Sequence, residues 1–304
     1  MRRRAAPCRP GTAALARPWA SGGSLPSWHR RISPSVGVKW ENEVLYDLHV
    51  HSTVSDGLLS PEEIVEAAFQ TDLKGFSLTD HDTLGGIKAA RDYLVEKKWP
   101  LVFVPGIELN TDFRESETHI LGYFIHYEDE KLDKRLRQIW SARYERAMKM
   151  VERLRIMGLN ISFEQVQRIA RGDLIGRPHI AKALLEKGYV FSIKEAFQKY
   201  IGRGKPAYVP RYKFTPEEAI ALIKDAGGVS VLAHPGLIRE QDAILQIIEM
   251  GIEGIEVYYP EHSEEQIAEY SALARRKGLL ITGGSDFHGI GSGESRGRLP
   301  VGIG

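Results

Sequence analysis

The chain has 304 residues, of which 42% are hydrophobic, and its formal net charge is +1. This length suits one large α/β domain or a barrel with an insertion, and no apolar run approaches the roughly 18 residues that a membrane helix needs. The single cysteine, Cys8, excludes internal disulfides and thiolate metal sites, which fits a reducing cytoplasm and leaves histidine and carboxylate as the available metal ligands.

The charge is distributed unevenly along the chain. Residues 1–39 contain eight Lys/Arg and no Asp/Glu, residues 131–213 contain 20 Lys/Arg against seven Asp/Glu, and the remainder carries a net charge of −20. An acidic body with a basic insertion favours cations bound in the body and an anionic substrate held between the two parts. A basic helical face exposed to solvent would give the same numbers of charged residues.

Residues 1–39 are rich in Arg, Ala, Pro, Ser and Gly and show no apolar periodicity. Their composition is similar to that of a transit peptide, and a disordered tail or a start codon assigned too early explains it equally well. We therefore exclude this segment from the predicted fold.

The first predicted strand leads from Val44 into the segment Asp47-Leu48-His49-Val50-His51. Residues two apart in a strand project from the same face, so His49 and His51 converge, and Asp56 follows within a short turn. Neutral imidazole suits divalent metals. Because two spaced histidines are common, a half-buried strand with locally bonded histidines explains this stretch alone equally well.

Short apolar strands then alternate with amphipathic helices. Ser60-Pro61-Glu62-Glu63 predicts a helix start, with a Ser cap, Pro in the first turn and Glu three residues after the cap. Strands are expected at 75–79, 101–104 and 118–124, with a helix at about 85–97. The polar residues that accompany these strands are Asp80-His81-Asp82, Glu108 and, near the start of the last strand, His119.

Residues 130–213 interrupt this alternation with four predicted helices. The first is long, at about 130–156, and shorter ones follow near 162–171, 178–187 and 192–201. We therefore expect a basic helical insertion that caps the substrate.

The alternation resumes at Thr215-Pro216-Glu217-Glu218, which repeats the helix start at Ser60. Strands are expected at 229–232, 254–257 and 279–282. These strands end at His234, near Glu256, and at Asp286-Phe287-His288.

Residues 40–129 and 214–304 together give about seven β/α units. This number predicts an α/β barrel with its active site at the carboxyl ends of the strands. A doubly wound sheet is the alternative, but such a sheet gathers its site at one switch point, whereas ligands here accompany nearly every strand.

Nine side chains of metal-binding type lie near the ends of predicted strands, apart from one near a strand start. All are imidazole or carboxylate donors of the kind that Zn²⁺, Mn²⁺ and Fe²⁺ accept. Chance rarely places such donors on nearly every strand, so the set predicts a metal centre. Its members are His49, His51, Asp56, His81, Glu108, His119, His234, Asp286 and His288.

Four blocks of the sequence resemble the motifs of the PHP (polymerase and histidinol phosphatase) family. They are Asp47-Leu48-His49-Val50-His51, Thr79-Asp80-His81-Asp82, Ala233-His234-Pro235 and Gly284-Ser285-Asp286-Phe287-His288. The resemblance covers residues 45 to about 304. Within the family the chain is most similar to stand-alone nucleotide phosphatases with an inserted helical domain, on the segments Gly176-Arg177-Pro178-His179 and Gly204-Lys205-Pro206-Ala207-Tyr208-Val209.

The resemblance implies a distorted (β/α)₇ TIM-like barrel with two or three clustered divalent metals. Many relatives have His in place of Asp56, and a carboxylate there favours a harder ion, so Mn²⁺ is expected ahead of Zn²⁺, Fe²⁺ or Mg²⁺. The implied ligands are His49, His51, Glu108 and Asp286 for the first metal, Glu108, His119 and His234 for the second, and Asp56, His81 and His288 for the third.

The implied chemistry is attack on phosphate by a metal-activated water, which requires no Ser or Cys nucleophile. Asp80 and Asp82 flank His81 and are candidates to orient ligand imidazoles, although ordinary turn residues explain them equally well.

The insertion supplies the expected substrate contacts. Arg177 and Lys205 are predicted to bind phosphate, and His179 to bind the substrate or donate a proton to the leaving oxygen. Each of them taken alone is also explained as a surface charge or a helix-start residue. Weaker candidates are Arg203, Tyr208 and Arg211.

The favoured function is a metal-dependent phosphoesterase that hydrolyses phosphomonoesters of small nucleotides, such as nucleoside 3′,5′-bisphosphates. A 5′→3′ exonuclease on short RNA or DNA ends is the alternative, and the aromatic residues Tyr189, Phe191, Tyr200 and Tyr208 leave that choice open. Histidinol phosphatases generally lack the insertion, and non-catalytic PHP modules often lose ligands that are all present here. No membrane and no obligate protein partner are expected.

Deletion of residues 1–39 should leave the specific activity within about twofold, because this segment contains no predicted ligand and no packed periodicity. The measurement compares full-length and truncated protein on one substrate. A truncated protein that is folded but inactive would contradict the prediction.

Overall fold

The computed structural model describes residues 46–71, 73–114, 116–170, 175–210 and 212–289, except for the side chain of Gln241. The amino-terminal tail and the candidate Arg211 lie outside these ranges, so the predictions for them stay predictions. Across the described ranges, none of the helices is both long and apolar enough to cross a membrane.

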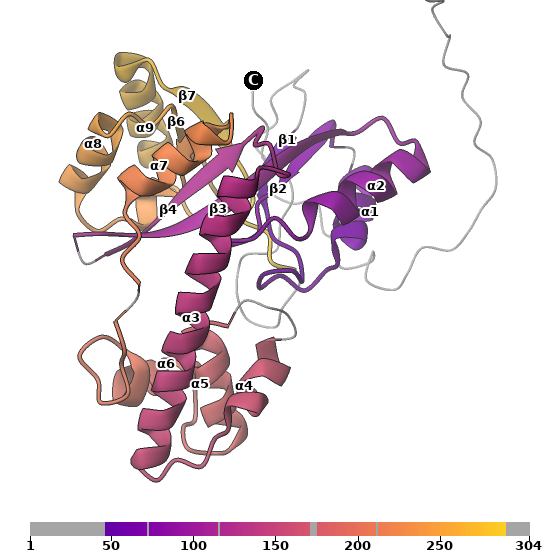
Figure 1. The fold of residues 1–304 in the computed structure, drawn as a ribbon. Coiled ribbons are helices and arrows are strands. Elements are labelled where there is room, and N and C mark those ends of the chain that lie inside the picture. Colours follow the sequence, from indigo (N-terminus) through magenta and orange to yellow (C-terminus); the bar gives the residue numbers. More distant parts are fainter. Residues whose placement is uncertain (1–45, 72, 115, 171–174, 211, 290–304) are drawn as a thin grey trace, which may run out of the picture. The chain divides into compact units, whose positions relative to one another are not determined.

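Within these ranges a seven-stranded sheet forms the body of the protein, with its strands in chain order (Figure 1). The last strand returns to the first, where the His51 N–H donates to the carbonyl oxygen of Phe287 at 2.9 Å. The sheet thus nearly closes into a barrel, which confirms the predicted TIM-like fold. The strands are β1 (Tyr46–Val50), β2 (Gly75–Leu78), β3 (Val102–Phe113), β4 (Ser116–Tyr123), β5 (Val229–Leu232), β6 (Gly254–Tyr258) and β7 (Leu280–Gly283).

The helices that cover the barrel begin where their capping residues predict. Ser60, Thr215 and Ser263 each accept the backbone N–H three residues later, and the side chain at that position returns to the cap. Their apolar faces pack against the strands in continuous clusters of buried side chains. These helices are α1 (Pro61–Gln70), α2 (Ile87–Lys97), α7 (Pro216–Asp225), α8 (Gln241–Glu249) and α9 (Glu264–Lys277).

The fourth strand runs against the direction of its neighbours. β3 extends to Phe113, well beyond the predicted end, and forms an antiparallel hairpin with β4 in which Asn110 faces His119. β4 is also antiparallel to β5. The start of β4 therefore lies at the edge where the other strands end, and this places His119 beside the remaining predicted ligands.

The helical insertion has a hydrophobic core of its own. Buried side chains from its helices, including Met150, Ile180 and Leu184, form one cluster. The helix predicted at 192–201 is divided into a short α-helix and a π-helical turn. The helices are α3 (Glu130–Ile156), α4 (Phe163–Ala170), α5 (Arg177–Glu186) and α6 (Ile193–Ala196), followed by the turn Phe197–Ile201 (Figure 1).

Helix α3 belongs to both cores. Its first half contributes Leu132, Leu136 and Ile139 to the barrel cluster, whereas Met150 and Leu154 from its second half lie in the insertion cluster. A helix of this length spans about 40 Å. One continuous helix therefore connects the barrel to the insertion.

Replacement of Leu184 by Ala should lower the free energy of unfolding by about 2–5 kcal/mol, because this side chain is fully buried in the insertion core. The adjacent Leu185 is 37% exposed, and its replacement by Ala should change stability by only about 0.5 kcal/mol. Chemical denaturation of both variants measures the difference. Equal effects would show that α5 does not bury the face described.

Candidate metal centre

Glu108 on β3 is fully buried, and its carboxylate contacts five imidazoles. Three imidazole nitrogens lie within 3.1–3.2 Å of Oε2 and two lie within 2.7–3.1 Å of Oε1. A single side chain therefore joins donors from β1, from β4 and from the segments that follow β2 and β5. The histidines are His49, His51 and His81 at Oε2, and His119 and His234 at Oε1.

The first group of donors consists of His49, His51, Glu108 and Asp286, all buried. Asp286 Oδ1 lies 3.5 Å from His49 Nε2 and 3.2 Å from His51 Nε2. Within the described residues, both Nε2 atoms and Glu108 Oε2 are buried without a hydrogen-bond partner. Four ligands at about 2.0–2.2 Å from a tetrahedral metal lie about 3.3–3.6 Å apart. The donor spacing thus fits a shared cation.

A second group is formed by Glu108, His119 and His234. His119 Nδ1 lies 2.7 Å from Glu108 Oε1, His234 Nε2 lies 3.1 Å from the same oxygen, and the two nitrogens are 3.2 Å apart. These side chains are the ones that the family resemblance assigns to the second metal.

A third group gathers around Asp56, which is 37% exposed at its side chain. One carboxylate oxygen lies 3.2 Å from His288 Nε2, and the other lies 3.8 Å from His81 Nε2. His51 also joins this group, because its Nδ1 lies 3.8 Å from Asp56. All nine predicted donors therefore lie in one continuous cluster.

Glu256 fixes two of these histidines and is absent from the predicted set. Its Oε1 lies 3.0 Å from His49 Nδ1, and its Oε2 accepts the backbone N–H of His234 at 2.6 Å. When Nδ1–H is donated to a carboxylate, Nε2 keeps the lone pair that faces a metal. A sequence signal existed, because Glu256 is a carboxylate in the middle of the apolar strand β6.

The loop after β7 is held against β1. Asp47 accepts the backbone N–H of Ser285 at 2.9 Å and its hydroxyl at 2.6 Å. A Cβ on Gly284 would lie 2.2 Å from His49 Cβ, so only glycine permits this approach. The contacts place Asp286 beside the histidines of β1.

Several residues of the site have backbone torsions that are rare outside glycine. The φ angle is +26° at His234 and +52° at Asp286, conformations that cost about 1–3 kcal/mol each. Glu256 holds the backbone N–H of His234, and the Tyr259 hydroxyl donates to Asp286 Oδ2 at 3.1 Å. The surrounding contacts thus hold both residues in their strained conformations.

Asp80 and Asp82 make hydrogen bonds that differ from those predicted. Asp80 accepts from the Ser52 backbone and from the hydroxyls of Ser52 and Ser55, so it orders the loop that leads to Asp56. Asp82 accepts from the side chain of Asn110, and Asn110 in turn lies 3.1 Å from His81 Nδ1. Both aspartates are therefore connected to the predicted ligands through intermediate residues.

The carboxylates favour positive charge on the imidazoles that face them. Burial lowers the pKa of His51, but the neighbouring carboxylates of Asp286 and Glu108 outweigh it and raise the pKa to about 10. Burial of His119 is likewise outweighed by Glu108, and its pKa rises to about 10. For His81 burial prevails and lowers the pKa to about 4. A divalent cation would neutralise the same carboxylates. Metal binding can therefore replace the protons that these imidazoles would otherwise carry.

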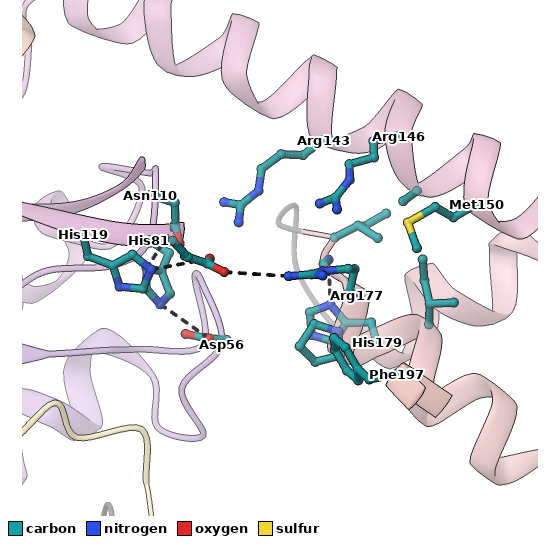
Figure 2. A pocket seen from close by; sticks show the side chains of 16 residues that line it. Asp56, His81, Asn110, His119, Arg143, Arg146, Met150, Arg177, His179 and Phe197 are labelled. Atoms are coloured by element: carbon teal, nitrogen blue, oxygen red, sulfur yellow. Dashed lines mark hydrogen bonds and ion pairs between the residues drawn. The ribbon is translucent and has the colours of Figure 1, made fainter. Parts of the chain in front are cut away.

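A cavity of about 370 Å³ lies between this cluster and the insertion. Figure 2 shows Asp56, His81 and His119 on one side of it and basic residues on the other. Arg143 and Arg146 come from α3, and α5 supplies Arg177 and His179 (Figure 2). Sequence analysis did not identify Arg143 or Arg146, because α3 carries many basic residues with no sign of which ones face the site.

The predicted substrate-binding residues occupy different environments. Arg177 lines the cavity, lies over the Phe197 ring and is 3.7 Å from Glu117. His179 Nδ1 accepts the Gly176 N–H at 3.1 Å, so in the neutral ring the proton is on Nε2. Burial lowers the pKa of His179. Lys205 is exposed and is not among the residues that line this cavity.

The PHP domain family model matches residues 47–281. The 5′-3′ exoribonuclease Rnm of Escherichia coli is 36% identical over 250 residues, which are 81% of this chain and 85% of that protein. The 3′,5′-nucleoside bisphosphate phosphatase of Chromobacterium violaceum is 34% identical over 255 residues, 81% and 88% of the two chains. A Bifidobacterium adolescentis protein described as a metal-dependent phosphoesterase superposes with a TM-score of 0.70 at 32% identity, covering 80% and 87%.

Replacement of Glu256 by Gln should weaken metal binding by about 10–100-fold, because His49 loses the carboxylate that fixes its orientation. Competition with a chromophoric chelator measures the affinity. Glu253→Gln is the matched control, since this residue lies just before the same strand, is exposed and contacts Ser230 instead. Equal affinities of the Glu256 variant and the unmodified protein would contradict the assigned role.

Proposed function

The chain belongs to the PHP domain family and is a hydrolase of phosphate esters, and from this premise we propose that it removes one phosphate from a small nucleotide that carries two. The nine clustered donors are the proposed ligands of two or three divalent metals. The helical insertion is the proposed cap over the substrate.

The observation that carries this proposal is the arginine group opposite the metal-binding side chains. A phosphate bound at the metals occupies only one end of the cavity, and Arg146 and Arg177 offer planar, charge-assisted donors for a second phosphate at the other end, while Arg143 pairs with Asp82 beside His81. Met150 and Phe197 add an apolar wall that suits a base. The cavity therefore fits a nucleoside 3′,5′-bisphosphate.

In the proposed complex, the 3′-phosphate lies at the metal ligands and the 5′-phosphate at the arginines. Bound metals would supply an activated water and neutralise the phosphate oxygens. The arginines fix the position of the phosphorus, because they hold the end of the substrate that does not react. His179 donates a hydrogen bond from Nε2, since its lowered pKa keeps the ring neutral near pH 7.

We assign Mn²⁺ as the preferred ion. The group around Asp56 combines a carboxylate with three imidazoles, and such mixed oxygen and nitrogen donors suit Mn²⁺ better than Mg²⁺, which requires mainly oxygen ligands. Zn²⁺ and Fe²⁺ are the competing ions for this donor set.

Removal of divalent metal should abolish hydrolysis, and Mn²⁺ should restore it better than Mg²⁺. Replacement of His49 by Ala should remove metal and activity while circular dichroism stays unchanged. Elemental analysis alongside the assay makes the test decisive. Full turnover in protein shown to contain no metal would reject the mechanism.

Replacement of Arg177 by Ala should lower kcat/KM for a 3′,5′-bisphosphate by about 10–100-fold, equivalent to the roughly 1.5–3 kcal/mol of one charge-assisted contact. An aryl monophosphate should be affected far less, because it has no second phosphate. Arg168→Ala is the control, as this arginine is exposed on α4 and outside the cavity.

Equal losses on both substrates would mean that Arg177 contacts the reacting phosphoryl group or supports the fold. Arg177→Lys separates these cases, because it keeps a charge but removes the planar donor pair. No loss on either substrate would leave the insertion without a role in phosphate binding.

A further inference from the structure

One buried histidine has no role in the function proposed above. His262 follows β6, is 8% exposed, and is not one of the nine proposed ligands. Its Nδ1 lies 2.8 Å from the carbonyl oxygen of Val257, and its Nε2 lies 3.0 Å from the backbone nitrogen of Gly236. A carbonyl only accepts and a backbone N–H only donates, so the proton is on Nδ1 and Nε2 accepts. Both ring nitrogens are thus occupied, and burial lowers the pKa of His262, which keeps the ring neutral.

Gly236 belongs to the turn that carries the proposed ligand His234. Pro235–Leu237 forms a single 3₁₀ turn, closed by the Leu237 N–H, which donates to the carbonyl oxygen of His234 at 3.0 Å. The first N–H groups of a helical turn have no partner inside it, and His262 provides one for Gly236. A Cβ on Gly236 would lie 2.6 Å from His262 Cδ2, so only glycine lets the turn approach the ring this closely.

Side chains from β6 and the loop after it hold this turn at both ends. At its start, Glu256 accepts the backbone N–H of His234, and one residue beyond Pro235, His262 accepts the backbone N–H of Gly236. His234 has its unfavourable φ of +26° between these two contacts. Because such a torsion persists only when the surroundings enforce it, loss of either contact should let the imidazole of His234 move.

His262 also packs on the residue that supports Asp286. The rings of His262 and Tyr259 have their centroids 5.1 Å apart, and the Tyr259 hydroxyl donates to Asp286 Oδ2 at 3.1 Å. The Tyr259 ring lies 5.4 Å from the His234 ring as well. His262 therefore contacts the supports of both strained residues of the site.

We propose that His262 is a positioning residue of the metal centre. It fixes the turn of His234 through Gly236, and it packs behind Asp286 through Tyr259. β6 contributes none of the nine proposed ligands, and with the loop after it this strand instead supplies groups that orient ligands from neighbouring strands. The inference rests on the proposed function, because it requires that His234 and Asp286 hold metal.

The experiment separates the two ring nitrogens of His262. The amide of Asn replaces the Nδ1 position and the amide of Gln replaces the Nε2 position, so only His262→Gln keeps an acceptor for the Gly236 N–H. His262→Asn should weaken binding of Mn²⁺ to the metal-free protein by about 10-fold, whereas His262→Gln should stay within about threefold of the unmodified protein. Titration with Mn²⁺, with the free ion followed by its electron paramagnetic resonance signal, measures the affinity.

Two further variants separate positioning from general stability. His262→Phe keeps a ring against Tyr259 but offers no acceptor, so it should also lose about 10-fold in Mn²⁺ affinity, and it decides the question if His262→Asn does not fold. Leu273→Ala removes a buried side chain of α9 in the barrel core, away from the turn. It should lower the denaturation midpoint and leave the Mn²⁺ affinity unchanged.

The outcomes distinguish the inference from its premise. If the unmodified protein binds no divalent metal, the proposed function fails. If it binds Mn²⁺ and the Asn and Gln variants bind this ion equally well, with or without a loss, the proposed function stands and the role of His262 is rejected. The same conclusion follows if Leu273→Ala weakens Mn²⁺ binding as much as His262→Asn does.

Discussion

The structure depends on a carboxylate that is taken out of water and surrounded by imidazoles. A buried ion costs several kcal/mol unless opposite charge lies close to it. Burial opposes ionisation of Glu108, but His81, His49 and His119 outweigh it and hold the pKa well below its usual range. The interior of the barrel therefore requires positive charge at this point, whether as protons or as metal ions. Imidazoles from β1, from β4 and from the segments that follow β2 and β5 satisfy that requirement together.

The reversal of β4 determines where the insertion begins. Because β4 runs against its neighbours, its last residue, Tyr123, pairs with Val229 at the start of β5. The chain thus leaves the sheet at the edge opposite the candidate metal-binding side chains, and α3 must run back past the barrel before the insertion can begin. The same reversal that brings His119 into the cluster also accounts for the length of this helix.

Most of the proposed ligands could be picked out from sequence because they follow a local rule, a donor near the end of a short apolar strand. The rest depends on contacts between distant segments. Glu256 acts on His49, 207 positions away. Arg143 and Arg146 are two basic residues among many on α3, and only the packing of that helix selects them. The hairpin was missed because polar residues alternate through the end of β3, and its turn at Arg114 has a positive φ without glycine.

The double membership of α3 has a mechanical consequence. The helix is packed in the barrel core up to Ile139, which anchors it. If the helix tilted about this point, the displacement of each residue would grow with its distance from Ile139. At 1.5 Å per residue, Arg143 lies about 6 Å beyond the anchor and Ile156 about 25 Å. A tilt of 8° would displace the far end by roughly 3.5 Å and Arg143 by less than roughly 1 Å. A tilt of this kind would therefore move the far end of the insertion several times farther than the arginine nearest the anchor.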